Sequence, residues 1–348
     1  MKEVDYIIVG CGLAGIAFTE ILFQNKKSFV VFDNSSQQSS VVAAGLYNPV
    51  ILKRFSPVWK AKEQLQIALP NYENIEKRLQ IKIDYQLKLL RRFASIEEQN
   101  LWFTALDRPS LNHYLSPEII KNKNEYIDAP FGFGQVNQVG RLDTELLIKA
   151  YKKWLSTNNN LQNETFDYSE INIQKDFIKY KNFKAKHIIF AEGFGLKKNP
   201  FFNSLPLNGT KGETIIIDAP NLKIDYGIKS SVFLIPIEND LYKVGATYEW
   251  EDKTNNPTDK GKSKLIKKLK TFLKCDFKII DQKAGIRPTV IDRRPLVGKH
   301  EEFKSLYVLN GLGTRGLMIG PYVAKQLYYF IENNIELNDE IDIKRFNK

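Results

Sequence analysis

A glycine-rich turn near the N-terminus limits the possible folds of this 348-residue chain more than any other feature. Gly10, Gly12 and Gly15 follow a buried-strand pattern over residues 6–9 and precede a run with helical spacing over residues 16–24. The first glycine permits a tight turn, the second lets the backbone approach a pyrophosphate, and the third lets the helix pack closely on the strand. The helix N-terminus then offers free N–H groups and partial positive charge to a diphosphate.

The segment after this helix completes a dinucleotide-binding unit. Residues 29–32 form a second buried-strand pattern, and Asp33 ends it. Asp33 lies about 20 positions beyond the first glycine, where a carboxylate accepts hydrogen bonds from an adenosine ribose. We predict that Leu13, Ala14 and Asn34 also contact the dinucleotide. The alternative is a plain tight turn, and the turn alone does not distinguish FAD from NAD.

The rest of the chain mixes strand-like and helix-like periods, which indicates an α/β or α+β architecture. Residues 60–80 look helical on both sides of Pro70, which is expected to break or kink the helix. Asp143 is expected to cap a helix over residues 145–155. Further elements are expected as strands over residues 186–190, 214–217, 232–235, 242–247 and 306–309, and as a final helix over residues 317–331.

The net charge of +11 has two interpretations. In the first interpretation, the lysines are spread over a solvated surface. In the second, the charge binds an anionic partner such as RNA. Residues 253–270 favour the second, because they hold seven lysines against one acid, Asp259. No aromatic residue interrupts this stretch, so it does not indicate a platform for base stacking.

Composition and cysteine usage indicate a globular protein of a reducing compartment. Hydrophobic residues make up 43% of the chain and charged residues 26%. We expect no signal peptide, no membrane span and a cytoplasmic location. Cys11 and Cys275 cannot build a disulfide framework. The three histidines are scattered, so we predict no metal site.

Five further segments resemble the D-amino-acid, glycine and sarcosine oxidase family of FAD enzymes, in the family's order. They are residues 43–49 (AAGLYNP), 190–193 (FAEG), 207–213 (LNGTKGE), 285–298 (GIRP, then Asp292 and PLVG) and 310–317 (NGLGTRGL). The resemblance spans nearly the whole chain. It implies a Rossmann-like FAD-binding domain and a second domain on a mostly antiparallel sheet. The expected boundaries are residues 1–60, 136–205 and 284–348 for the FAD domain, and 61–135 and 206–283 for the substrate domain.

The resemblance also implies how FAD is held. The loop over residues 311–316 would approach the pyrimidine edge of the flavin, where the helix dipole and backbone N–H groups stabilise the negative charge of the reduced ring. A glycine C-cap and turn is the alternative. The residues implied to contact the cofactor, besides those of the first turn, are Ala44, Gly45, Leu46, Ala191, Gly193, Gly285, Arg287, Gly311, Leu312, Gly313, Thr314, Arg315, Gly316 and Leu317.

Three residues are candidates for the chemistry. Arg287 occupies the family's carboxylate-binding place, where a guanidinium fork fixes both binding and orientation; a structural salt bridge is the alternative. Arg315 is a second candidate, or it orders its loop. Lys243 resembles the lysine that sarcosine oxidases place near flavin N5 for oxygen activation, and a solvent-facing strand lysine is the alternative. No catalytic base is required, because the cofactor carries the hydride chemistry.

Two departures from the family matter. Phe233 stands where glycine oxidases carry a tyrosine near the substrate, which puts glycine itself in doubt. Sarcosine oxidases bind flavin through a cysteine near the places of Pro288 and Thr289, so we expect non-covalent FAD.

The expected reaction is oxidation of a C–N bond in a small amine or amino acid, with hydride transfer to flavin, imine hydrolysis and reoxidation by O2 to give peroxide. The first alternative is removal of a carboxymethyl group from a tRNA wobble uridine. Residues 45–47, 292–298 and 313–317 also resemble the FAD domain of the bifunctional enzyme that matures 5-methylaminomethyl-2-thiouridine. Further alternatives are a flavin dehydrogenase that uses an electron carrier and a non-catalytic nucleotide-binding protein. Substrate identity, electron acceptor and oligomeric state stay open.

Overall fold

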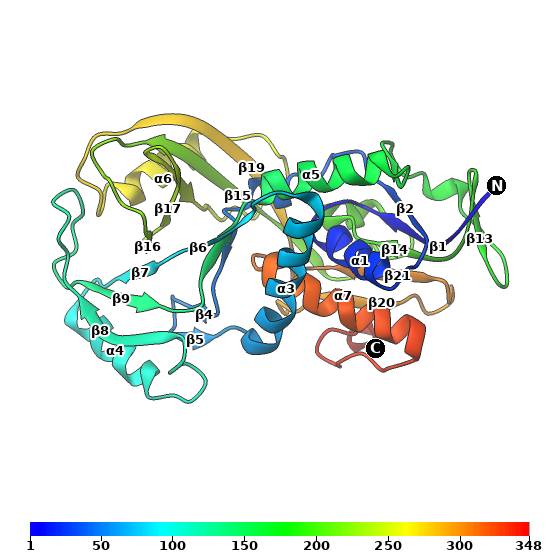
Figure 1. Cartoon of the computed structure of the whole chain (residues 1–348), viewed down its shortest axis with the longest axis horizontal. Coiled ribbons are helices and arrows are strands. Elements are labelled where there is room, and N and C mark those ends of the chain that lie inside the picture. The colour runs from blue at the N-terminus through cyan, green and yellow to red at the C-terminus, as the bar shows by residue number, and fades with distance from the viewer. Residues whose placement is uncertain (348) are drawn as a thin grey trace.

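The computed structural model describes residues 1–347, which form two lobes, each built on a large β-sheet (Figure 1). Helix α3 (Ala61–Leu79) lies between the lobes in this view. Strands β15 (Leu207–Asp218) and β19 (Lys278–Val290) pair along their whole length and extend from one lobe to the other.

The first lobe holds a largely parallel sheet with strand order β11-β2-β1-β14. β21 continues this sheet in parallel on β14, and β20 pairs antiparallel with β21. The central strands are buried on both faces, as their continuous hydrophobic runs predict. The bounds are β1 Lys2–Val9, β2 Phe29–Phe32, β11 Leu161–Gln162, β12 Asn172–Ile173, β13 Ile178–Tyr180, β14 Phe183–Phe190, β20 Leu296–Lys299 and β21 Leu306–Asn310.

Three helices of the first lobe confirm the predicted elements. They are α1 (Leu13–Gln24), α5 (Thr144–Thr157) and α7 (Gly316–Asn333). The carboxylate of Asp143 accepts a 3.0 Å hydrogen bond from the N–H of Leu146, so the predicted N-cap of α5 is confirmed.

Of the two outcomes expected at Pro70, a break or a kink, the break is absent, because α3 continues through this residue as one helix. The proline removes one backbone hydrogen bond. Leu65 and Ala68 before it, and Tyr72 and Ile75 after it, are all buried on one face. Tertiary packing of an amphipathic face supplies most helical stability, so burial on both sides holds the helix together.

The second lobe holds an eight-stranded sheet with order β19-β15-β18-β17-β16-β7-β9-β8. Every neighbouring pair is antiparallel except β16 with β7, so the predicted, mostly antiparallel sheet is confirmed. Helix α6 (Asp259–Leu269) packs on β15 and β18. The other bounds are β7 Leu89–Arg92, β8 Leu115–Ile120, β9 Phe133–Val136, β16 Gly227–Lys229, β17 Phe233–Glu238 and β18 Leu241–Gly245.

Strand β15 joins the hydrophobic cores of the two lobes. Leu207 packs in the core of the first lobe, together with Val290 of β19. Ile215 and Ile217 pack in the core of the second lobe. The residue boundaries given above for the two domains therefore fall near paired strands that both lobes share, and they stay a prediction.

Short elements complete the fold. Strands β3, β10 and β6 form a small antiparallel sheet, and β4 pairs with β5. Among residues 1–347, no helix combines the length and apolar character needed to cross a membrane. The bounds are α2 Ser39–Val42, α4 Ile96–Leu106, β3 Leu46–Tyr47, β4 Val50–Ile51, β5 Ser56–Pro57, β6 Asp84–Gln86, β10 Gly140–Leu142, and the 3-10 helices η1 Tyr168–Glu170, η2 Gly193–Lys198 and η3 Ile343–Phe346.

Candidate functional site

A cavity of about 1070 Å³ lies between the two lobes, and both contribute to its walls. Cofactor and ligand sites usually occupy roughly 300–1,000 Å³, so this cavity has room for a large cofactor. The predicted residues that line it are Gly10, Gly12, Leu13, Ala14, Asp33, Ala44, Gly45, Leu46, Ala191, Gly193, Gly285, Arg287, Leu312, Gly313, Thr314, Arg315, Gly316 and Leu317.

Four predicted residues lie outside this lining: Gly15, Asn34, Gly311 and Lys243. Gly15 serves packing, because a Cβ atom there would lie 2.0 Å from the carbonyl oxygen of Gly10. This is the close contact between helix and turn that the third glycine was expected to permit. The side chain of Asn34 instead donates to Thr165 at 3.0 Å.

The glycine-rich turn is packed against the end of β14. Gly10 has a φ of +100°, and a Cβ atom there would lie 2.5 Å from the carbonyl oxygen of Ala191. The carboxylate of Asp33 accepts hydrogen bonds of 3.0 Å from the N–H groups of Cys11 and Ser35. It also pairs with Lys152. Asp33 therefore braces the turn at the edge of the cavity where an adenosine ribose is expected.

Two helices begin at the cavity, and neither has a side-chain cap from its own N-cap residue. Neither α1, which follows Gly12, nor α7, which follows Arg315, has an acidic residue in its first turn. At the start of α1, the N–H of Leu13 donates a 3.2 Å hydrogen bond to the hydroxyl of Ser40. Gly313 in the loop before α7 has a φ of +58°, and the space beside it is open. Helix N-termini carry partial positive charge. The pair fits FAD, whose diphosphate suits one terminus and whose flavin pyrimidine edge suits the other.

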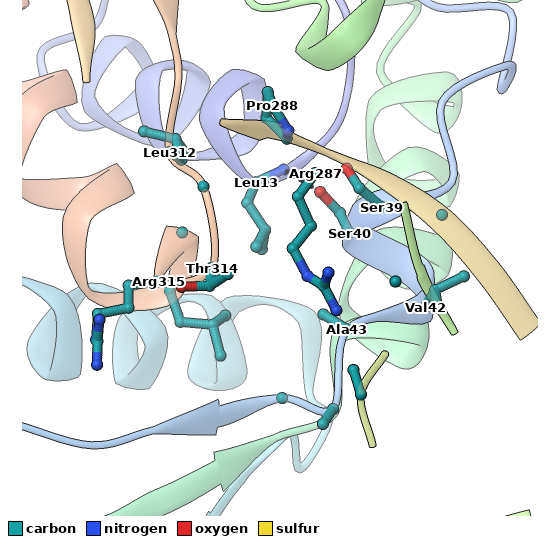
Figure 2. Close-up of a pocket in the computed structure, with 18 of the residues that line it drawn as sticks. Leu13, Ser39, Ser40, Val42, Ala43, Arg287, Pro288, Leu312, Thr314 and Arg315 are labelled. Atoms are coloured by element: carbon teal, nitrogen blue, oxygen red, sulfur yellow. Dashed lines mark hydrogen bonds between the residues drawn. The ribbon is translucent and has the colours of Figure 1, made fainter. Parts of the chain in front are cut away.

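Arg287 extends from β19 into the cavity toward Ala43 (Figure 2). Its Nη1 donates a 3.2 Å hydrogen bond to the carbonyl oxygen of Thr247. The guanidinium carbon lies 4.7 Å from the ring centroid of Tyr248. Burial lowers the pKa of this guanidinium. Among the described residues, Arg287 makes no ion pair with a carboxylate, which disfavours the salt-bridge alternative.

Arg315 also lines the cavity, but it points away from Arg287 (Figure 2). Burial lowers its pKa as well. Its backbone carbonyl accepts hydrogen bonds from Met318 and Ile319 in the first turn of α7. These are backbone contacts of the helix start, and the role of the Arg315 side chain stays a prediction.

Lys243 of β18 connects the second lobe to the loop before β3. Its Nζ donates a 2.9 Å hydrogen bond to the carbonyl oxygen of Ala43, a cavity-lining residue. Burial lowers the pKa of this amine to about 8. Lys243 is thus half-buried and bonded, in contrast to the solvent-facing alternative, and its role in oxygen activation stays a prediction.

One row of residues crosses the floor of the cavity. Thr214 of β15 pairs with Gly245 of β18, Gly245 with Phe233 of β17, and Phe233 with Lys229 of β16. All four residues line the cavity. Paired residues of neighbouring strands share one face of a sheet, so the register explains why Phe233 and Lys229 face the same space.

Sequence reasoning missed a basic and hydroxyl-rich part of the lining. It consists of Lys53, Arg54, Arg91, Lys229, Ser230, Ser231 and Lys268. Lys268 is the member of the lysine-rich stretch at residues 253–270 that reaches the cavity. Lys253 of that stretch instead donates to the carbonyl oxygens of Gly209 and Trp250. Only knowledge of the strand order would have brought these residues together.

Glu192 is a buried acid of the cavity wall that sequence reasoning also missed. It accepts hydrogen bonds from the hydroxyl of Tyr168 and, at 2.8 Å, from the amide of Asn199. Burial raises its pKa to about 7. Cys11 lies on the same wall, and burial raises the pKa of its thiol to about 12. Among residues 1–347, no group of three potential metal ligands is present.

Comparisons with known proteins agree with this geometry. Glycine oxidase of Bacillus subtilis (strain 168) is 23% identical over 370 residues, covering 97% of this chain and 95% of the relative. The crystal structure of glycine oxidase from Geobacillus kaustophilus superposes with a TM-score of 0.79 at 18% identity, covering 97% of this chain and 96% of the other.

A more local similarity links this chain to a tRNA-modifying protein. The tRNA 5-methylaminomethyl-2-thiouridine biosynthesis bifunctional protein of Campylobacter jejuni subsp. doylei is 27% identical over 142 residues. This match covers 37% of the present chain and 23% of the relative.

The model of the DAO family, described as FAD dependent oxidoreductase, matches residues 5–329. This match spans both lobes, the glycine-rich turn, Arg287 and the loop before α7. The chain therefore belongs to the DAO family of FAD-dependent oxidoreductases.

Proposed function

We propose that this enzyme oxidises the C–N bond of an amine or amino acid whose carboxylate is held by Arg287. The observation that carries the proposal is the guanidinium of Arg287, which is directed into the cavity and has no carboxylate partner among residues 1–347. A buried guanidinium grips a carboxylate through two parallel hydrogen bonds. Such a grip fixes the carbon beside the nitrogen relative to the cofactor.

Bound FAD supplies a two-electron acceptor for the hydride. In the substrate, the C–H bond beside the nitrogen breaks, and the nitrogen lone pair closes a C=N bond. Water then hydrolyses this imine to a carbonyl compound and an amine. We propose that the two electrons pass on to O2, which becomes hydrogen peroxide. Arg287 orients the substrate throughout these steps, and the half-buried amine of Lys243 assists the reduction of O2.

The phenylalanine at position 233 supports a substrate other than glycine. Phe233 lines the cavity and offers no hydroxyl group to a small polar substrate. The full-length similarity to a glycine oxidase supports the same class of C–N chemistry. We therefore propose an N-substituted or side-chain-bearing amino acid as the substrate.

A second candidate substrate is an amine on a modified tRNA base. Tyr248 and Trp250 line the cavity, and their side chains are 49% and 50% exposed. Exposed aromatic rings beside cationic groups suit base stacking. The local similarity to a tRNA-modifying protein supports this candidate.

The test is reduction of the FAD-loaded protein in the absence of oxygen. Glycine, sarcosine, D-amino acids, proline and a tRNA bearing carboxymethylaminomethyluridine would each be added while the flavin absorbance is recorded. Bleaching by a small amino acid supports the proposal, and bleaching by the tRNA alone favours the second candidate. No bleaching by any of these amines would count against both.

A matched pair of arginine variants tests the role of Arg287. Arg287→Lys keeps the charge but loses the bidentate grip, so the substrate concentration for half-maximal reduction is expected to rise at least tenfold. Arg294→Lys is the control, because Arg294 pairs with Glu340 outside the cavity lining. Equal behaviour of the two variants would contradict the assignment.

A further inference from the structure

One corner of the cavity collects cationic and hydroxyl groups from three separate elements. Lys229, Ser230 and Ser231 lie at the end of β16 and in the turn that follows it. Arg91 comes from β7, which pairs with β16, and Lys268 comes from α6. We call these five residues the lysine corner.

The lysine corner is held in shape by contacts that occupy Arg91. This side chain pairs with Glu98 and donates to the carbonyl oxygens of Lys229 and Ser230, at 3.3 and 3.1 Å. The hydroxyl of Ser231 donates a 2.8 Å hydrogen bond to the carbonyl oxygen of Lys268, which ties α6 to the turn. The charge of Arg91 is therefore already compensated, and its side chain holds the turn after β16 in place.

The amines of Lys229 and Lys268 are the two positively charged groups of the lysine corner that those contacts do not neutralise. Among residues 1–347, neither makes an ion pair. The acids that line the cavity lie elsewhere and are occupied, since Asp33 pairs with Lys152 and Glu192 accepts two hydrogen bonds. The lysine corner thus holds two uncompensated positive charges, a situation that an anion relieves.

Lys229 is the more constrained of the two. Its Nζ lies 4.6 Å from the ring centroid of Phe233, which also lines the cavity. Burial, followed by the charges of Arg91 and Lys268, lowers the pKa of Lys229 to about 8. The like charges around a half-buried amine make it receptive to a negatively charged group.

The sheet separates the lysine corner from Arg287 by a defined span. Arg287 is on β19 and Lys229 on β16, with β15, β18 and β17 between them. Neighbouring strands lie about 4.8 Å apart, so four steps span about 19 Å across the sheet. Arg287 also lies four residues along β19 from Lys283, which pairs with Thr214 in the row of Lys229. At about 3.4 Å per residue this offset adds about 14 Å along the strand, so the two backbones lie roughly 23 Å apart. Both side chains extend into the same cavity. An amino acid as small as glycine cannot reach both cations, whereas a longer molecule can.

We infer that the lysine corner is a subsite for a second acidic group of the substrate. The preferred substrates are then amines with two acidic groups, a carboxylate on Arg287 and a carboxylate or phosphate on Lys229 and Lys268. This inference rests on the proposed function only through the place of the first carboxylate.

The experiment measures binding of unreactive anions to the FAD-loaded protein through changes in flavin absorbance. Valerate and glutarate have equal chain length but one and two carboxylates. Glutarate is expected to bind about 10- to 100-fold more tightly, the effect of gaining a hydrogen bond to a charged group. 4-Phosphonobutyrate keeps the three methylene groups of glutarate, replaces the second carboxylate by a phosphonate and distinguishes the two kinds of acid.

Variants locate the second group. Lys229→Gln and Lys268→Gln are each expected to bring the affinity for glutarate close to that for valerate, and Lys229→Arg to restore most of the difference. Lys264→Gln, on an exposed part of α6 outside the cavity lining, should change nothing. Full flavin content in each variant would verify that it is folded.

The two proposals fail in different ways. Equal affinities of the wild-type protein for valerate and glutarate would overturn the lysine corner, even if an amino acid reduces the flavin. A preference for glutarate that persists in Lys229→Gln and Lys268→Gln would overturn it as well. Loss of substrate orientation in Arg287→Lys bears only on the proposed function.

Discussion

A Cβ atom on Gly212 of β15 would lie 1.9 Å from Nη2 of Arg287 on β19. The next nearest atoms to that Cβ position also belong to the guanidinium, at 2.1 and 2.3 Å. Arg287 therefore rests directly on the backbone of the neighbouring strand. Any side chain at position 212 occupies the place of the guanidinium.

Gly212→Ala is expected to displace Arg287 without disturbing the cofactor site. The methyl group moves a flexible side-chain end and leaves the backbone in place, so the flavin content should stay at the wild-type level. The substrate concentration needed for half-reduction should rise at least tenfold. Gly195→Ala is the control, because a Cβ atom there meets its nearest neighbour at an ordinary 3.5 Å. Unchanged substrate binding in Gly212→Ala would contradict the role of this contact.

Asp33 offers a test of the nucleotide end of the cavity. Its carboxylate accepts two backbone hydrogen bonds from the turn region, pairs with Lys152 and lines the cavity where the ribose is expected. Asp33→Asn removes the charge, so the dissociation constant for FAD is expected to rise about 10- to 100-fold. Titration of the apoprotein with FAD, followed by fluorescence, measures it. Asp276→Asn, an exposed change outside the cavity, should bind FAD like the wild type.

The strand, glycine-rich turn and helix at the start of the chain were predictable because their signals are local. The strand at residues 6–9, the glycine-rich turn and Asp33 are neighbours in sequence as well as in space. The N-cap Asp143 acts within its own helix. The role predicted for Arg287 comes from resemblance alone, since the strand around it carries no local pattern that points to a carboxylate.

The lysine corner was not predictable from local pattern. Lys229 meets Arg91 through the parallel pairing of β16 with β7, and Lys268 through the packing of α6. These partners are distant in sequence. The sequence pattern around a lysine on a short strand does not distinguish a solvent-facing side chain from one that faces a cavity. Pro70 shows the same limit, because burial on both sides of it decides that α3 continues.

Glu192 should make the stability of the protein depend on pH. Its pKa is about 7 in the folded protein, against 4.5 for an ordinary glutamate. The folded state therefore holds a proton that the unfolded state has lost, and stability falls as pH rises from 4.5 to 7. The loss amounts to at most about 3 kcal/mol.

Glu192→Gln is expected to abolish this part of the pH dependence. Urea unfolding at pH 5 and pH 8 measures the free energy of unfolding of both proteins. From pH 5 to pH 8, the free energy of unfolding of the wild type should fall by up to about 3 kcal/mol more than that of the variant. Glu164→Gln, which breaks an exposed pair with Lys181, serves as the control. An equal pH dependence in wild type and Glu192→Gln would contradict the raised pKa.

Binding of a second acidic group should weaken as pH rises through about 8, because Lys229 then loses its proton. The charged groups around this amine are Arg91 of β7, paired with Glu98, and Lys268 of α6. Both cations favour the neutral amine, whereas a bound anion favours the charged one. The affinity for glutarate is therefore expected to fall up to tenfold per pH unit above pH 8, while that for valerate stays nearly constant. Lys229→Arg stays charged, so its affinity for glutarate should be as independent of pH as its affinity for valerate. A flat glutarate profile in the wild-type protein would show that the amine of Lys229 does not hold the second acid.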